Sequence, residues 1–154
     1  MFTPKPDWLK VKLPLGRKFI EIKGLVKHLK LATVCEEANC PNMGECWAGG
    51  TATFMLLGKV CTRGCRFCNV ESGKPQPPDP AEPLNILKAV SSMRLSYVVL
   101  TMVTRDDLPD GGAQHIYNTV KTLKDNIKNL AVETLVSDLA GNEQSIKKVL
   151  DAEP

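Results

Sequence analysis

TFMLLGKVCTRGCRFC, at residues 53–68, is an apolar run that leads directly into three closely spaced cysteines. Residues 53–60 are rich in strand-forming side chains, and Cys61, Cys65 and Cys68 follow at the far end of this predicted strand. In proteins built from alternating strands and helices, ligands bind at the carboxyl ends of the strands. The stretch therefore predicts an α/β fold that presents its cysteines at the functional edge of a parallel sheet.

Strand and helix patterns alternate three times along the rest of the chain. Residues 97–103, YVVLTMV, are apolar without alternation, which is typical of a parallel strand buried on both faces. Residues 130–136 predict a further strand. The alternation predicts right-handed βαβ units. Because a closed (β/α)₈ barrel takes about 250 residues, we expect a partial barrel of about three βα units.

Three helices are expected between and after these strands. Asp79 is the predicted N-cap of the first helix, and Glu82 is its capping-box acid. The second helix follows the loop RDDLPDGG, and the third starts at Asn142. Helical spacing predicts the buried faces. The face of the first helix consists of Leu84, Leu87, Val90 and Met93, and that of the second of Ile116, Val120, Leu123 and Ile127.

The cysteine-containing N-terminal part has a different character. Residues 1–50 are predicted to form an irregular N-terminal extension, and residues 51–154 to form the first half of the partial barrel. Several prolines before residue 18 indicate an extended arm without a regular element. One short helix is expected at residues 21–31, with Leu25 and Leu29 on one face.

Composition and charge exclude several classes of function. The net charge of +3 is too small to favour a nucleic-acid partner. No run approaches the roughly 18 apolar residues of a membrane span, and the N-terminus lacks the apolar core of a secretory signal. We therefore expect a cytoplasmic protein with neither a nucleic-acid nor a membrane partner. In that reducing compartment, six cysteines confined to residues 35–68 indicate metal ligands rather than disulfides.

Cys61, Cys65 and Cys68 have the spacing C-x₃-C-x₂-C. Three thiolates bind three irons of a cuboidal [4Fe–4S] cluster and leave the fourth iron open to another ligand. We expect Gly64 to let the loop turn between the ligands, and Phe67 to place an aromatic ring beside the last one. The alternative is a zinc site. Zinc takes four ligands that usually come in two pairs, so the unequal triplet favours an iron–sulfur cluster.

This spacing is the signature of the radical S-adenosylmethionine (SAM) superfamily. A second triplet, C-x₄-C-x₅-C, precedes it at Cys35, Cys40 and Cys46. Residues 33–68, which contain both triplets, strongly resemble lipoyl synthase. The resemblance continues in the stretches VTRDDLPDGGAQH and ETLVSD and covers nearly the whole chain.

The resemblance implies a radical SAM enzyme of the sulfurtransferase type. Lipoyl synthase inserts two sulfur atoms at C6 and C8 of a protein-bound octanoyl-lysine to give lipoyl-lysine. By position, Cys61, Cys65 and Cys68 would be the catalytic ligands of a SAM-binding [4Fe–4S] cluster. The first triplet would hold an auxiliary [4Fe–4S] cluster that donates the sulfur. Acid–base groups cannot break an alkyl C–H bond, so these cofactors must perform the difficult step.

The resemblance also implies partners. These are octanoylated lipoyl-carrier domains (E2 subunits of 2-oxoacid dehydrogenases and the glycine cleavage H protein), an electron donor such as flavodoxin or ferredoxin, and an iron–sulfur carrier. In full-length relatives, the serine of a C-terminal Arg-Ser-Ser-Tyr motif is the fourth ligand of the auxiliary cluster, and this sequence lacks that motif. We therefore expect the N-terminal part of such an enzyme. The alternative is a truncated, non-catalytic iron–sulfur binding module that needs a missing C-terminal half.

Candidate cofactor-binding residues beyond the cysteines are Phe67, Arg105, Asp106 and Glu133. The arginine and aspartate follow the second strand at the catalytic end, where loop residues often bind ligands. The glutamate is a charge inside an apolar run, and such a residue is usually paired or functional. The alternative for the loop after the second strand is a solvated segment whose Asp110 caps the next helix. His115 is predicted to be an ordinary boundary residue and not a metal ligand.

Overall fold

The computed structural model describes Pro6 and residues 16–48 and 51–154. These residues form a four-stranded sheet in the order β1–β2–β3–β4. The strands are β1 (Ala32–Thr33), β2 (Thr53–Leu56), β3 (Tyr97–Met102) and β4 (Ala131–Leu135). β1 runs antiparallel to β2, whereas β2, β3 and β4 are parallel to one another. The predicted extended arm lies almost wholly outside the described residues.

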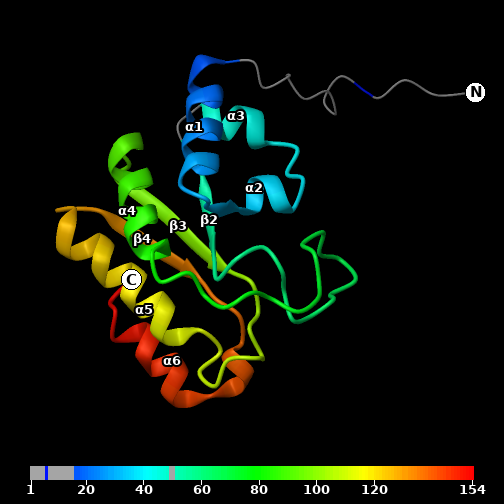
Figure 1. Cartoon of the computed structure of the whole chain (residues 1–154). Helices are drawn as coiled ribbons and strands as arrows, with labels where there is room; N and C mark the ends of the chain where they lie inside the picture. Colours follow the sequence, from blue (N-terminus) through cyan, green and yellow to red (C-terminus); the bar gives the residue numbers. More distant parts are fainter. Residues whose placement is uncertain (1–5, 7–15, 49–50) are drawn as a thin grey trace, which may run out of the picture.

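Helices connect the parallel strands, as the alternating pattern predicts. α4 (Glu82–Met93) joins β2 to β3, and α5 (Ala113–Asn126) joins β3 to β4. After β4, a short 3₁₀ turn, η2 (Leu139–Gly141), leads to α6 (Glu143–Leu150). Figure 1 shows α4, α5 and α6 next to one another along one side of the sheet. The α/β fold class is therefore confirmed, while the partial barrel of about three βα units stays a prediction.

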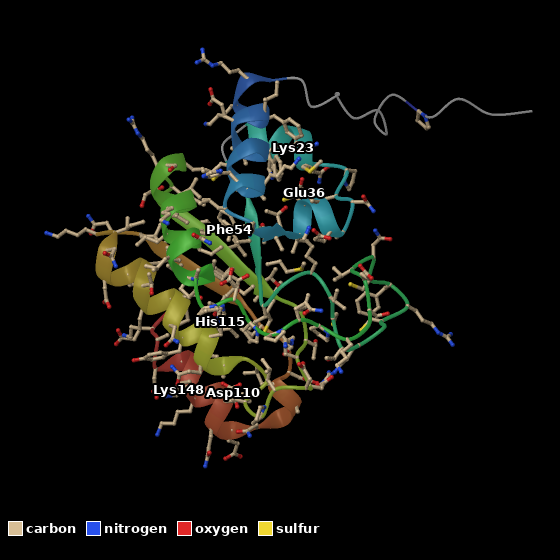
Figure 2. The ribbon with its side chains drawn as sticks, viewed as in Figure 1. Lys23, Glu36, Phe54, Asp110, His115 and Lys148 are labelled. Carbon is tan, nitrogen blue, oxygen red and sulfur yellow. The ribbon has the colours of Figure 1, made fainter. Side chains whose placement is uncertain are left out.

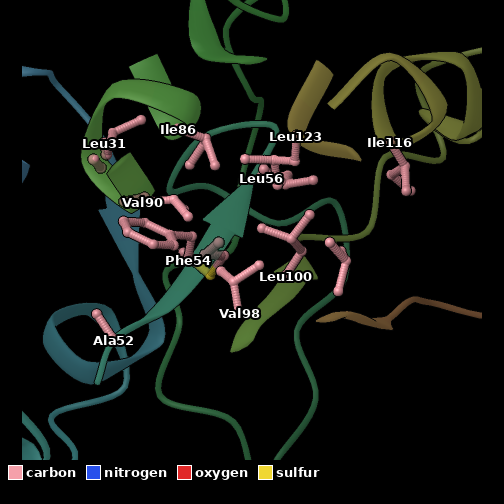
Figure 3. Close-up of a cluster of buried hydrophobic side chains, with 14 of the residues drawn as sticks. Leu31, Ala52, Phe54, Leu56, Ile86, Val90, Val98, Leu100, Ile116 and Leu123 are labelled. Carbon is pink, nitrogen blue, oxygen red and sulfur yellow. The ribbon is translucent and has the colours of Figure 1, made fainter. Parts of the chain in front are cut away.

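The core lies between the sheet and these helices. Phe54 pairs with Leu100, and Val98 pairs with Val132, so these side chains project from the same face of the sheet. They are buried against apolar side chains of α4 and α5, including Ile86 (Figure 3). Each fully buried side chain of this kind contributes about 1.5–3 kcal/mol to folding. This face fixes where each parallel strand ends, and thus where the loops after the strands lie.

The opposite face of β3 and β4 is open, which corrects the prediction that β3 is buried on both faces. Tyr97 is 49% exposed, and Val99 and Thr101 are only half-buried. Glu133 and Leu135 of β4 are exposed on the same side. The described residues place one layer of helices on the sheet. An unbroken apolar run indicates that both faces of a strand are suited to burial. It does not show whether other elements of the fold pack on both faces.

Residues 17–48 fold into helices around β1, so the prediction of an irregular extension is wrong for this segment. The helices are α1 (Arg17–His28), α2 (Val34–Glu37) and α3 (Met43–Ala48). α1 begins earlier than predicted, and Leu25 on it is only half-buried. The buried face of α1 consists instead of Phe19, Ile22 and Val26. The ring of Trp47, from α3, lies 5.1 Å from that of Phe19, and this packing partner determines which face of α1 is buried.

α4 differs from its prediction at its start and on its buried face. The carboxylate of Asp79 accepts a hydrogen bond from the Ala81 N–H at 2.8 Å, so it caps the turn before the helix. Glu82 is the first residue of α4 and is buried. Leu84 is 56% exposed, and the buried positions beyond the first turn are Ile86, Ala89 and Val90. The helical period is right, but the buried face is rotated toward α5.

The two later helices agree with the sequence pattern. In α5 the predicted face is buried at Ile116, Val120 and Leu123. α6 begins after Asn142, whose side chain accepts a hydrogen bond from the Ser145 N–H at 3.0 Å. Among the described helices, none has the length and apolar character needed to cross a membrane.

Candidate iron–sulfur site

The cysteine loop, residues 61–73, leaves the sheet beyond the carboxyl end of β2. Backbone hydrogen bonds of 2.8 and 2.9 Å join Cys61 to the returning end of the loop. The Cys68 N–H donates to the Cys65 carbonyl at 3.0 Å, and both of these cysteines are exposed. The loop is therefore closed at its base, where the first thiol lies, and open at its tip, where the other two lie.

The sharp turn into this loop is not made at Gly64. Leu57 and Gly58 have positive φ values of 70° and 98°, whereas Gly64 does not have a positive φ. The sharp turn predicted at Gly64 is therefore made at Leu57 and Gly58 instead, both in a left-handed backbone conformation. The chain changes direction immediately after β2, before the first cysteine.

Arg63 ties the cysteine loop to the loops after the next two strands. Its guanidinium donates to both carboxylate oxygens of Asp106, at 2.8 and 2.7 Å. It also donates to Asp138 at 2.8 Å. Asp106 follows β3 and Asp138 follows β4, so the carboxyl ends of three parallel strands meet at one side chain. The sequence pattern predicted charged residues in these loops, but it did not predict that they contact one another.

Thr62 adds three contacts to the same junction. Its hydroxyl donates to the Thr104 carbonyl at 3.0 Å and lies 2.9 Å from the Asp106 carboxylate. Its backbone N–H also donates to the Thr104 carbonyl, at 3.0 Å. Hydrogen bonds from Arg63 lower the pKa values of Asp106 and Asp138, so both carboxylates are negative near neutral pH. The same hydrogen bonds raise the pKa of Arg63.

Arg105 is almost wholly buried, with 1% of its surface exposed. It donates to both carboxylate oxygens of Asp107, each at 2.8 Å, and to the Leu57 carbonyl at 3.2 Å. Hydrogen bonds from Arg105 lower the pKa of Asp107. Its side chain is thus engaged inside the protein, beneath the turn that leads to the cysteines. A role in binding SAM through this residue stays a prediction.

Asp110 caps α5, as the alternative reading of this loop proposed. Its two carboxylate oxygens accept hydrogen bonds from the N–H groups of Gly112, at 2.9 Å, and Gln114, at 2.7 Å. Figure 2 shows Asp110 at the start of α5, below His115. Gly111 and Gly112 both have positive φ values, which explains the two glycines in this turn.

A cavity of about 330 Å³ lies between the loops after β3 and β4. The predicted cofactor-binding residues Arg105 and Asp106 both line it, together with polar residues such as Ser137 and Asn142. Phe67 and Glu133 are not among its lining residues. Phe67 is 93% exposed. Glu133 projects from the open face of the sheet, where it accepts a hydrogen bond from the Tyr97 hydroxyl.

The first cysteine triplet lies on and between α2 and α3. Cys35 is buried in α2, and the Cys40 N–H donates to its carbonyl at 3.1 Å. Cys46 is exposed in α3. Desolvation and then the thiols of Cys35 and Cys40 raise the pKa of the Cys46 thiol, so the three thiols lie within electrostatic range of one another. Cys35 and Cys46 thus come from two short helices, and Cys40 lies in the segment between them.

One ion pair links the segments that carry the two triplets. Lys59, between β2 and Cys61, forms an ion pair with Glu37 at the end of α2, with a distance of 3.3 Å between Nζ and Oε1. Glu37 lies between the first two cysteines of the first triplet. This contact brings the segment before one triplet against the helix that bears the other.

The donor atoms of both triplets fit iron–sulfur clusters. Each triplet offers thiols, which are the usual ligands of such clusters. The Arg63 N–H donates to Cys61 Sγ at 3.4 Å, and hydrogen bonds to sulfur help to set the potential of a cluster. The buried Trp47 Nε1 has no hydrogen-bond acceptor among the described residues. Within residues 16–48 and 51–154, no three His, Cys, Asp or Glu side chains converge tightly enough for a single metal ion.

Comparison with known proteins agrees with this site. The sequence pattern of the radical SAM superfamily matches residues 55–153, and that of the N-terminal domain of lipoyl synthase of the radical SAM family matches residues 3–40. Lipoyl synthase of Myxococcus xanthus is 52% identical over 152 residues, which are 99% of this chain and 51% of that protein. Lipoyl synthase 2, mitochondrial, of Pisum sativum is 53% identical over 95% of this chain and 40% of its own length. The apicoplast lipoyl synthase of Plasmodium vivax is 54% identical over 96% of this chain and 34% of its own length.

A three-cysteine loop at the carboxyl end of β2, within a match that extends over most of the chain, defines the class: the chain belongs to the radical SAM superfamily. Membership implies an iron–sulfur cluster and SAM. Within the superfamily the chain is similar to lipoyl synthases and corresponds to their N-terminal part. It spans about a third to a half of the length of these relatives. Because they include mitochondrial and apicoplast proteins, the cytoplasmic location stays a prediction.

Proposed function

We propose that this chain provides the part of a lipoyl synthase that binds two [4Fe–4S] clusters and SAM. The proposed reaction is the insertion of two sulfur atoms at C6 and C8 of a protein-bound octanoyl-lysine. The observation on which the proposal depends is the ion pair between Lys59, which precedes the second triplet, and Glu37, which lies within the first. A sulfur donor has to lie close to the centre that activates the acyl chain, and this contact favours that arrangement.

The two triplets have separate roles in the proposal. Cys61, Cys65 and Cys68 hold the SAM-binding cluster, and the first triplet holds the auxiliary cluster. When bound, these groups and SAM supply the radical abstraction of hydrogen and the sulfur atoms. Cys65 and Cys68 lie exposed at the tip of their loop, and Cys61 is held at its base. A cluster bound there keeps one side free for SAM.

The remaining residues of the site bind and orient. Arg63, Asp106 and Asp138 hold the cysteine loop against the neighbouring loops. The cavity lined by Arg105 and Asp106 lies beside this junction and offers polar groups to the amino-acid part of SAM. Phe67 and Glu133 complete the proposed SAM-binding set, from the exposed tip of the cysteine loop and from the open face of the sheet.

The proposed partners follow from the similarity to lipoyl synthases. The octanoyl chain arrives on a lipoyl-carrier domain, such as an E2 subunit of a 2-oxoacid dehydrogenase or the glycine cleavage H protein. Electrons arrive from a small reductant such as flavodoxin or ferredoxin. An iron–sulfur carrier replaces the auxiliary cluster once its sulfur has been used.

A second candidate function is a non-catalytic iron–sulfur binding module. Two observations favour it. The chain spans about half or less of the length of its relatives. The face of β3 and β4 that carries Tyr97 and Glu133 is open among the described residues. In this reading, the chain binds clusters but requires a complementary polypeptide for turnover.

Anaerobic reconstitution followed by iron and sulfide quantification tests the proposal. We expect about eight irons per chain, and a spectral change when SAM is added. Replacing either triplet with alanines reduces the content to about four irons, and only the Cys61, Cys65 and Cys68 variant loses the response to SAM. Zinc in place of iron at both triplets contradicts the proposal.

A second assay separates the two candidate functions. The reconstituted chain is supplied with SAM, dithionite and an octanoylated carrier domain, and 5′-deoxyadenosine and lipoyl-lysine are measured by mass spectrometry. Formation of lipoyl-lysine establishes the synthase activity. Full iron content and a response to SAM without lipoyl-lysine establish the binding module instead. The variant without the first triplet is the matched control, because it retains the SAM site but lacks the sulfur donor.

A further inference from the structure

Leu57 has an unusual backbone conformation at a sensitive position. It follows the last residue of β2 and precedes Cys61 by four residues. Its φ of 70° lies in the left-handed region, which residues with a branched side chain rarely adopt. Its side chain is 2% exposed, so solvent does not account for the conformation. Other parts of the protein must hold it in place.

Both backbone polar groups of Leu57 are bound by buried ionisable side chains. Its N–H donates to Glu82 Oε2 at 2.9 Å. Its carbonyl accepts a hydrogen bond from Arg105 Nη1 at 3.2 Å. Glu82 is 7% exposed, and Arg105 is 1% exposed. Two ionisable side chains from different elements are therefore buried against the two peptide groups that flank the Leu57 Cα.

Each of these side chains has a second partner, which is half-buried for Glu82 and exposed for Arg105. The same oxygen of Glu82 lies 2.7 Å from Nε2 of His115, which comes from the first turn of α5 (Figure 2). Arg105 is held by both carboxylate oxygens of Asp107. Burying ionisable groups is costly, and a core of apolar residues would stabilise the fold equally well. Their presence at one turn therefore indicates a requirement for a particular backbone geometry there.

Gly112 supplies the space for the side chain of Leu57. A Cβ atom at Gly112 would lie 2.4 Å from Leu57 Cδ1. The turn after β2 is thus enclosed by groups from α4, from the loop after β3 and from the start of α5. If Leu57 left its left-handed conformation, residues 58–60 would leave β2 in another direction, and Cys61 would lose its place at the base of the loop.

We propose that Glu82 and Arg105 are positioning residues that hold Leu57 left-handed and so keep Cys61 in place for cluster binding at the second triplet. This inference rests on the proposed function, because it assigns the residues a task in that site. Neither residue touches the cluster. Both act through the backbone of Leu57, Glu82 at its N–H and Arg105 at its carbonyl. His115 supports Glu82, and Asp107 supports Arg105.

The test compares iron binding by variants in a background that lacks the first triplet, so that only the second triplet is counted. Glu82→Ala leaves the Leu57 N–H without an acceptor, and we expect its iron affinity to fall about tenfold or more. Glu82→Gln retains an oxygen that accepts this hydrogen bond, and we expect binding close to that of the parent chain. The spectral response to SAM is measured in parallel. We expect it to be altered in Glu82→Ala and preserved in Glu82→Gln.

Val90→Ala is the matched control for general loss of stability. Val90 is fully buried in the same helix as Glu82, yet it makes none of the hydrogen bonds at Leu57. Its loss destabilises the fold without changing the turn. In the metal-free chain, Glu82→Ala increases hydrogen exchange at the amides of Leu57 and Cys61, whereas Val90→Ala does not increase exchange at these two amides selectively.

The outcomes separate this inference from the proposed function. If the parent chain does not bind iron at the second triplet, the proposed function fails, and the role in cluster binding fails with it. If the parent binds iron and Glu82→Ala binds it equally well, with the same response to SAM, the positioning role is wrong and the proposed function stands. Equal losses in Glu82→Ala and Val90→Ala would also overturn the positioning role, because they would indicate stability alone.

Discussion

Gly112→Ala is the substitution whose effect the structure defines most closely. Gly112 has a φ of 93°, and a Cβ there would meet Leu57 Cδ1 at 2.4 Å. A side chain in a left-handed conformation costs about 1–2 kcal/mol. Overpacking a buried site costs about 1–3 kcal/mol, and Leu57 is 2% exposed, so it has little room to move. We therefore expect the free energy of unfolding to fall by about 2–5 kcal/mol.

Urea unfolding followed by circular dichroism measures this change. Gly24→Ala is the control, because Gly24 lies within α1, has no positive φ, and a Cβ there meets no atom within 4 Å. We expect Gly24→Ala to stabilise the chain by about 0.5–1 kcal/mol, since alanine suits a helix interior better than glycine. If the free energy of unfolding of Gly112→Ala lies within about 0.5 kcal/mol of that of the parent, the predicted clash is refuted, because Leu57 then repacks without cost.

Three further predictions concern the loops around the site. Asp110→Ala removes the acceptor of two N–H groups at the start of α5, and we expect the free energy of unfolding in urea to fall by about 1 kcal/mol. Asp110→Asn keeps an acceptor oxygen and should retain most of the stability of the parent chain. Arg105 lowers the pKa of Asp107, so this pair stabilises the fold above the ordinary aspartate pKa of about 3.9, and the contribution is lost as pH falls through the lowered folded value. Asp107→Asn should therefore weaken the pH dependence of thermal unfolding in acid, and an unchanged profile would contradict this. Arg63→Ala should leave the midpoint of urea unfolding almost unchanged, because the ion pairs are partly exposed, but should increase hydrogen exchange across residues 61–68.

The open face of the sheet affects the stability that such experiments measure. Tyr97 and Leu135 are 49% and 63% exposed on the side of the sheet that faces away from α4 and α5. Apolar groups in that position lose solvent when a further polypeptide or a substrate chain covers them. Stability measured on this chain is therefore that of a sheet with one covered face, and added partners should raise it by mass action.

The sequence by itself predicted the chemistry of the protein. Six cysteines in two unequal triplets favour iron–sulfur ligands over disulfides and paired zinc sites without any knowledge of the fold, because ligand type and spacing are local properties. The βα alternation likewise follows from local periodicity, and it placed the second triplet at the end of a strand. The apolar face of α5 was correct for the same reason, since Ile116, Val120 and Leu123 repeat at the helical period.

Only the tertiary structure decided which groups meet. Arg63 and Asp138 are 75 residues apart, and Leu57 and Arg105 are 48 apart, so their hydrogen bonds depend on the order of strands in the sheet. Periodicity identifies an apolar face but not its partner, which is why Leu84 is exposed while Ile86 is buried. The same limit applies to Glu82, whose carboxylate fits a helix cap by sequence but binds the Leu57 N–H in the structure. A local pattern states what a residue is able to do, and the contacts made by the folded chain select among those options.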